Sequence, residues 1–194
     1  MKLSIDIKSS SSPEWIQAVM NDFESFLKDH ADCERKASGM AQHLIAKYAD
    51  RTAIIPGLID LMIEEMEHFR DVYDLMQSKN ISLNKNMVPD AYVNALQKLR
   101  KSDVDGRFLD TILLGSVIEC RGAERFKMVA DHIEDKEMAK FYKRLWTSEA
   151  KHGHIFVKWA LNYFDEKTVY DRLDWLMDKE SEIIKNLPIK SALH

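Results

Sequence analysis

The sequence predicts an all-α fold, a four-helix bundle with additional flanking helices. The 194 residues include only six glycines and four prolines, too few for the regular turns of an all-β protein. Apolar residues recur at steps of three and four, which is the spacing of an amphipathic helix. Four segments with this spacing are long enough to form the helices of a bundle.

The first half of the chain predicts one short helix and two long ones. The short helix should begin near Pro13, because Ser12-Pro13-Glu14 offers an N-cap, an N1 proline and an early acidic residue, and it should end near Asn21. Long amphipathic helices follow over about 23–48 and 56–77. A short connection joins them, so we expect antiparallel neighbours.

A long connection then separates the two halves of the predicted bundle. It covers 78–106 and contains a modest helix near 89–101. This length can return the chain to the end where the next helix starts, and such crossovers are typical of ferritin-like bundles. The second half is predicted to form long helices over about 107–133 and 135–163, and a last amphipathic helix over 167–186.

Composition limits the class of protein. With 45% hydrophobic and 31% charged residues, the chain suits one domain over 1–194, with loose tails at 1–12 and 187–194. The net charge of −4 argues against nonspecific binding to nucleic acid or an anionic membrane, although a local basic patch leaves specific RNA binding open. No export signal or membrane span is indicated, so we expect a cytoplasmic protein without a membrane partner.

Metal-binding side chains interrupt the apolar stripes of the four long helices. Glu65-Met66-Glu67-His68 and Glu149-Ala150-Lys151-His152 both read Glu-x-x-His, and a step of three places both side chains on one helix face. For a lone motif, a surface glutamate and a hydrogen-bonded histidine would be the better interpretation. The spacing of two further glutamates favours a metal site.

Glu34 precedes Glu65 by 31 positions, and Glu119 precedes Glu149 by 30. The midpoint of each pair falls at a predicted turn, so each pair should meet across its hairpin. Four inward carboxylates would repel one another and be costly to desolvate, whereas two divalent cations offset their charge. We therefore predict a two-metal centre of the kind found in di-iron and di-manganese carboxylate bundles. Its six ligands are Glu34, Glu65, His68, Glu119, Glu149 and His152.

Other polar residues near these ligands receive different interpretations. Glu124 competes with Glu119, but its separation of 25 from Glu149 moves the hairpin midpoint away from the turn, so we predict a surface ion pair for it. Cys33 and Cys120 adjoin proposed ligands, yet neighbouring helical residues diverge by about 100°, which favours packing roles. We expect His43 and His154 to have surface roles.

Carboxylate-rich ligation with two imidazoles suits iron or manganese better than a closed structural zinc site. We favour two iron ions, by analogy, over manganese. Two adjacent reduced irons can pass electrons to dioxygen and generate an oxidant that attacks a C–H bond, so hydroxylation is chemically available.

Several blocks together resemble the MiaE family of tRNA hydroxylases over most of the chain. They are Asp32 to Ser38, Glu64 to Phe69, Gly115 to Phe126 and Phe141 to His152. The resemblance implies a non-haem di-iron monooxygenase that hydroxylates the isopentenyl group of 2-methylthio-N6-isopentenyladenosine beside the tRNA anticodon. It implies that the six ligands bind iron, that no further catalytic residue is required, and that dioxygen and an unidentified electron-donor protein take part.

The densest basic run in the sequence lies near the long crossover. It consists of Lys98, Arg100, Lys101 and Arg107. We predict that these residues contact tRNA phosphates, and the alternative interpretation is a solvated helix face.

Two other functions remain open at this stage. A ferritin- or rubrerythrin-like protein that handles iron or peroxide would share the ligand pattern without recognising RNA. A metal-free interaction bundle is the third interpretation.

Overall fold

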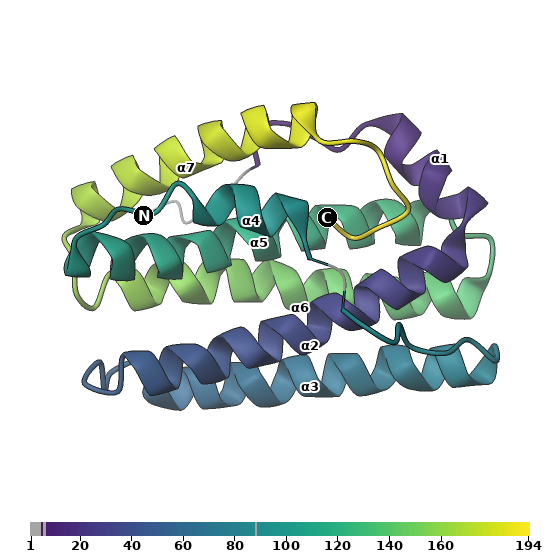
Figure 1. Cartoon of the computed structure of the whole chain (residues 1–194), viewed down its shortest axis with the longest axis horizontal. Helices are drawn as coiled ribbons and strands as arrows, with labels where there is room; N and C mark the ends of the chain where they lie inside the picture. The colour runs from purple at the N-terminus through teal and green to yellow at the C-terminus, as the bar shows by residue number, and fades with distance from the viewer. Residues whose placement is uncertain (1–4, 6, 88) are drawn as a thin grey trace. The chain divides into compact units, whose positions relative to one another are not determined.

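The computed structural model describes residues 5, 7–87 and 89–194, and all regular secondary structure in these residues is helical (Figure 1). The prediction of an all-α chain is confirmed. The helices are α1 (Pro13–Asn21), α2 (Phe23–Lys47), α3 (Ile55–Ser78), α4 (Ala91–Gln97), α5 (Val104–His132), α6 (Lys136–Ala160) and α7 (Glu166–Asn186).

Aspartate side chains fix the N-termini of five helices by accepting hydrogen bonds from backbone N–H groups of the first turn. The capping residues of α2, α4, α5, α6 and α7 are Asp22, Asp90, Asp103, Asp135 and Asp165. Each cap stabilises its helix by about 1 kcal/mol. Asp103 also explains why α5 begins at Val104 rather than near 107.

The chain divides into two compact units. The α2–α3 unit comprises residues 18–88 and 190–193, and the α5–α6 unit comprises residues 1–17, 89–189 and 194. The single domain over 1–194 stays a prediction.

In the α2–α3 unit, the two long helices pack side by side as an antiparallel pair (Figure 1). Phe26 and Leu44 of α2 and Leu58 and Val72 of α3 are fully buried. The Ser38 hydroxyl donates a 2.9 Å hydrogen bond to the backbone carbonyl oxygen of residue 62, which fastens α2 to the middle of α3.

In the α5–α6 unit, α5 and α6 form the main antiparallel pair, and α4 and α7 pack against α5 (Figure 1). The pair is closely packed, because a Cβ atom on Gly153 of α6 would lie 2.7 Å from Cys120 Sγ of α5. The Ser116 hydroxyl donates a 2.7 Å hydrogen bond to the Gly153 carbonyl oxygen at the same place. This close contact fixes the register of the helices that carry Glu119, Glu149 and His152.

Several residues in the segments expected to be loose tails, 1–12 and 187–194, make defined contacts. Ser191 donates a hydrogen bond to the Asp22 carbonyl oxygen, and the Leu193 N–H donates one to Asp29, both within the α2–α3 unit. In the α5–α6 unit, the His194 ring stacks on Tyr92 with centroids 4.9 Å apart. Ser9 and Ser11 are also bound, as described below, while 1–4 and 6 lie outside the described residues.

None of the helices in the described part of the chain combines the length and the apolar character that crossing a bilayer requires.

Candidate metal centre

The six predicted ligands are all buried, each 9% exposed or less. Three of them lie in each unit, as two carboxylates and one imidazole. We describe the two groups separately, as the α2–α3 triad (Glu34, Glu65 and His68) and the α5–α6 triad (Glu119, Glu149 and His152).

The α2–α3 triad gathers around His68. Its Nδ1 atom lies 3.4 Å from Glu65 Oε2 on the same helix and 3.8 Å from Glu34 Oε2 on α2. The three side chains each offer a ligand atom within 4.8 Å of the others. The step of three on α3 aims Glu65 and His68 the same way, and the α2–α3 hairpin brings Glu34 to meet them.

His30 supports Glu34 in this unit, although we assigned it no functional role from the sequence. It is fully buried one turn before Glu34, and its Nε2 atom lies 2.7 Å from Glu34 Oε1. An imidazole N–H that donates to a ligating carboxylate holds that carboxylate in one orientation. The spacing of four between His30 and Glu34 was the available signal for this contact.

The α5–α6 triad repeats the arrangement. His152 Nδ1 lies 3.0 Å from Glu149 Oε2 on α6. Glu119 of α5 completes the group, since all three side chains offer ligand atoms within 4.8 Å of one another. The close packing at Gly153 holds these two helices together one residue beyond His152.

The chemistry of each triad suits a divalent cation. Burying two carboxylates near one another costs free energy through desolvation and repulsion, and a bound cation offsets both. Carboxylate oxygens with one imidazole nitrogen are ligands that iron and manganese accept. The buried Glu and His clusters are thus compatible with a metal site.

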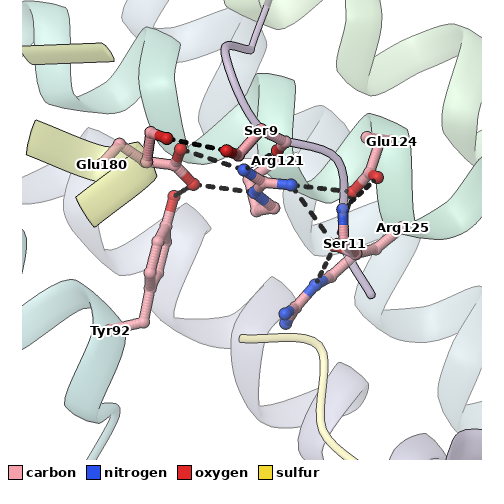
Figure 2. A network of polar contacts seen from close by, with 8 residues as sticks. Ser9, Ser11, Tyr92, Arg121, Glu124, Arg125 and Glu180 are labelled. Atoms are coloured by element: carbon pink, nitrogen blue, oxygen red, sulfur yellow. Dashed lines mark hydrogen bonds and ion pairs between the residues drawn. The ribbon is translucent and has the colours of Figure 1, made fainter. Parts of the chain in front are cut away.

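Glu124, the alternative to Glu119, is engaged elsewhere in the α5–α6 unit (Figure 2). Its carboxylate accepts 2.7 Å hydrogen bonds from the Ser11 N–H and hydroxyl and a 3.0 Å bond from Arg121 Nη1. The predicted ion pair is confirmed. Its predicted place at the surface is wrong, because Arg121 is fully buried and Glu124 is partly buried.

Arg121 is the centre of a buried polar network that the sequence did not reveal (Figure 2). Its Nε and Nη2 atoms donate to the two Glu180 oxygens of α7 at 2.7 and 2.9 Å, and Nη2 also donates to the Ser9 carbonyl oxygen. The hydroxyl of Tyr92 donates to Glu180, and burial beside that carboxylate raises the Tyr92 pKa well above its ordinary value. This network joins α4, α5, α7 and the segment before α1.

Arg125 lies next to this network, and its Nε donates to the Ser11 hydroxyl at 3.1 Å. Burial and the neighbouring Arg121 charge lower the Arg125 pKa to about 10. Its guanidinium carbon lies 4.6 Å from the Trp15 ring centroid, a cation–π contact that ties α1 to α5.

The other residues considered near the ligands are two cysteines and two histidines. Cys33 and Cys120 are half-buried and form no disulfide among the described residues. Cys120 packs against Gly153, in agreement with the packing role expected for it. His43 is exposed and His154 is half-buried.

The predicted tRNA-contact residues gather where α4 leads into α5. Lys98, Lys101 and Arg107 are exposed, and Arg107 Nε donates to the Lys101 carbonyl oxygen at 3.2 Å. Asp110 holds this segment, since it accepts from the Lys101 N–H at 2.7 Å and from Arg172 of α7. Arg100 is half-buried and donates to the Gln97 carbonyl oxygen.

The sequence matches one protein family and is similar to individual named proteins. The model of the family described as tRNA-(MS[2]IO[6]A)-hydroxylase (MiaE) matches residues 4–194. A Pseudomonas putida protein named tRNA 2-(methylsulfanyl)-N(6)-isopentenyladenosine(37) hydroxylase is 34% identical over 172 residues, which are 89% of this chain and 83% of that protein. A Salmonella typhimurium protein of the same name is 27% identical over 131 residues, 68% of this chain and 47% of that protein.

The fold also has a solved counterpart. A Synechococcus protein described as having aldehyde deformylating oxygenase activity is similar with a TM-score of 0.91 and 26% identity, covering 97% of this chain and 94% of that one. The predicted fold class, a ferritin-like bundle with flanking helices, is confirmed.

Proposed function

This chain belongs to the MiaE family of tRNA hydroxylases, and from that membership we propose that it hydroxylates a prenylated adenosine of tRNA. The substrate would be the isopentenyl group of 2-methylthio-N6-isopentenyladenosine next to the anticodon. The observation that carries this proposal is the family match over 4–194, in a chain whose long helices carry two buried Glu/Glu/His triads.

We further propose that the two triads together hold two iron ions, with manganese as the less favoured metal. The donor set supports this, because one glutamate from each of two helices and Glu-x-x-His from each of two others is the pattern of carboxylate-bridged di-metal bundles. When bound, such a pair supplies the two-electron chemistry by which one oxygen atom of dioxygen enters a C–H bond and the other leaves as water. The electrons would come from a donor protein that is not identified.

In the proposed reaction, the residues of the protein exclude water, orient a ligand and contact the substrate. The buried positions of the triads keep bulk water from the ligand atoms, and His30 holds the orientation of Glu34. No protein nucleophile is needed, since the reaction passes oxygen rather than an acyl or phosphoryl group. Lys98, Arg100, Lys101 and Arg107 would contact tRNA phosphates. We also propose a cytoplasmic location, because a tRNA substrate would be found there.

The direct test is to incubate the reduced, iron-loaded protein with isotopically labelled dioxygen and isopentenylated tRNA. Mass spectrometry of the nucleosides should then show one labelled oxygen atom added to the modified adenosine. Glu149→Gln should abolish the product, while Glu137→Gln, at an exposed position of the same helix, should leave it unchanged. A wild-type protein that yields no hydroxylated nucleoside refutes the proposal.

The alternative function, iron or peroxide handling of the ferritin or rubrerythrin kind, is examined with the same preparation. It predicts turnover of hydrogen peroxide, or oxidative uptake of many irons, without any change in the tRNA nucleosides. Hydroxylation of the nucleoside without such turnover excludes it.

A further inference from the structure

Helix α6 has a charge balance opposite to that of the whole chain. It contains six basic and two acidic residues, a net charge of +4, in a chain whose net charge is −4. One of the two acidic residues, the proposed ligand Glu149, is buried. The solvent-facing side of α6 therefore has a single acidic residue, Glu137. The six basic residues, all exposed, are Lys136, Lys140, Lys143, Arg144, Lys151 and Lys158.

The helical period gathers these cations on one side. With about 100° of rotation per residue, all six fall within a sector of about 100°, centred on the side of the helix away from Glu149 and His152. At about 1.5 Å per residue, Lys136 and Lys158 stand about 33 Å apart along the axis. We call this set of six cations the basic face of α6.

Three of the six cations keep their charge unpaired among the described residues. Lys140 pairs with Glu137 at 2.8 Å, and Arg144 lies over the Phe141 ring. Lys143, Lys151 and Lys158 make no ion pair with any residue that the structure describes. Next to the face, Lys127 of α5 pairs with Asp131 and lies 5.6 Å from the half-buried Trp146 ring centroid.

We propose that the basic face of α6 binds the phosphate backbone of the RNA substrate, an inference that rests on the proposed function. Lysines in a continuous row attract phosphates without reading the base sequence, and they orient a nucleic acid along their axis. An acidic protein partner is disfavoured, because protein interfaces are depleted in lysine and have apolar or aromatic cores. The basic face has no exposed large apolar side chain among the described residues.

The basic face of α6 is a different surface from the tRNA-contact residues predicted from the sequence, which lie between Lys98 and Arg107. The run from Lys98 to Arg107 is dense in sequence, but Asp103 and Asp105 lie within it. The basic face has more cations and only Glu137 to oppose them. It should therefore supply the larger part of the electrostatic affinity for RNA.

The test measures binding of a fluorescently labelled, isopentenylated anticodon stem-loop RNA to the iron-loaded full chain by anisotropy across a salt series. The triple variant Lys143→Gln, Lys151→Gln and Lys158→Gln should bind about 10- to 100-fold more weakly at about 0.1 M salt. Its plot of log affinity against log salt should be shallower by about 2 to 3, since each lost phosphate contact removes slightly less than one unit. The two proteins should converge at high salt.

A matched control changes three exposed lysines of the α2–α3 unit, as Lys79→Gln, Lys85→Gln and Lys190→Gln. It makes the same change in net charge and should keep the wild-type salt slope. Circular dichroism of both variants verifies that the helices are intact. Equal slopes in the two triple variants overturn the inference.

The remaining outcomes separate this inference from the proposed function. If wild-type protein binds the RNA, the α6 variant loses binding and no nucleoside is hydroxylated, the basic face is an RNA surface and the proposed reaction is wrong. If the α6 variant binds RNA like wild type but loses only turnover driven by a protein electron donor, the face binds an acidic redox partner and the inference is overturned. For an active enzyme, the α6 variant should show a raised KM for RNA and an unchanged kcat.

Discussion

Helices α3 and α6 carry the same Glu-x-x-His motif toward the interior but present different surfaces to solvent. α3 has six acidic residues and one basic residue, and it exposes Ile59, Ile63, Met66 and Tyr73. α6 has six basic and two acidic residues and, among the described residues, no exposed large apolar side chain.

The comparison shows that the buried side and the solvent side of each helix are under different physical constraints. Under the proposed function, metal binding sets the inward positions, because ligand type and spacing depend on the cation. Nothing in that chemistry acts on the outward positions, which are free to match other partners. The outer side of α6 is basic and that of α3 is acidic and partly apolar, so the two surfaces differ in the charged groups that they attract.

We expect the strongest effect from removing the buried glutamate of the Glu-x-x-His motif, which both helices carry. Glu65→Gln on α3 and Glu149→Gln on α6 should each abolish formation of the hydroxylated nucleoside and lower the iron content per chain, because each removes a charged ligand. Activity assays and elemental analysis measure the two effects. Glu67→Gln and Glu137→Gln, at exposed positions of the same helices, are the controls. If only one of the ligand variants lost iron, the two motifs would not share a role.

The buried positions that α3 and α6 share could be predicted from the sequence, because the patterns that indicate them are local. Glu-x-x-His spacing needs only the helical period, and the helix ends follow from capping aspartates such as Asp135 and from the proline Pro13. The bounds of α2 and α3 also match the expected ones within one residue. The meeting of Glu34 with Glu65 followed from their spacing and the predicted turn between them, and the Glu-x-x-His step added His68.

The features that sequence reasoning missed depend on long-range contacts or on three-dimensional grouping. Arg121 received no role from sequence reasoning, because its partners lie far along the chain: Glu180 is 59 positions later and Ser9 is 112 positions earlier. No periodicity within α5 reports those neighbours. The basic face of α6 was not recognised because its cations are spread from Lys136 to Lys158, with gaps of up to seven positions. A search for basic runs along the chain favours the crossover near Lys98 instead.

The next largest effect tests whether the network at Arg121 supports the unit that contains α6. Arg121→Met should lower the free energy of unfolding by about 3 to 5 kcal/mol, since it leaves the buried Glu180 carboxylate without its cation. Chemical denaturation measures this. The double variant Arg121→Met with Glu180→Leu should recover part of the loss, because no unpaired charge is then left buried. A single variant as stable as wild type would show that the pair is dispensable.

A smaller effect is expected from the group that orients a ligand on the α2–α3 side. His30→Ala should weaken iron binding about 10- to 100-fold, less than the loss of a ligand, because it removes a supporting hydrogen bond to Glu34. Metal titration with a competing chelator measures the affinity. His30→Gln keeps a donor and should restore part of it. An unchanged affinity in His30→Ala would assign His30 to packing.

We expect the weakest effect from charge changes on the solvent-facing side of α3. Neutralising Asp60, Glu67 and Asp74 on α3 as the amides should change RNA affinity by less than about threefold, since α3 is not expected to contact phosphates. Anisotropy with the anticodon stem-loop RNA measures this. If this variant lost RNA affinity as strongly as the lysine variant of α6, the assignment of RNA binding to the basic face of α6 would fail.

Mössbauer spectroscopy of the protein loaded with isotopically enriched iron tests directly whether the two triads hold one pair of iron ions. We predict the spectrum of one spin-coupled iron pair per chain in the oxidised wild-type protein, and its loss in Glu65→Gln and Glu149→Gln alike. A spectrum of isolated iron ions, or a wild-type protein that retains no iron, would contradict the account.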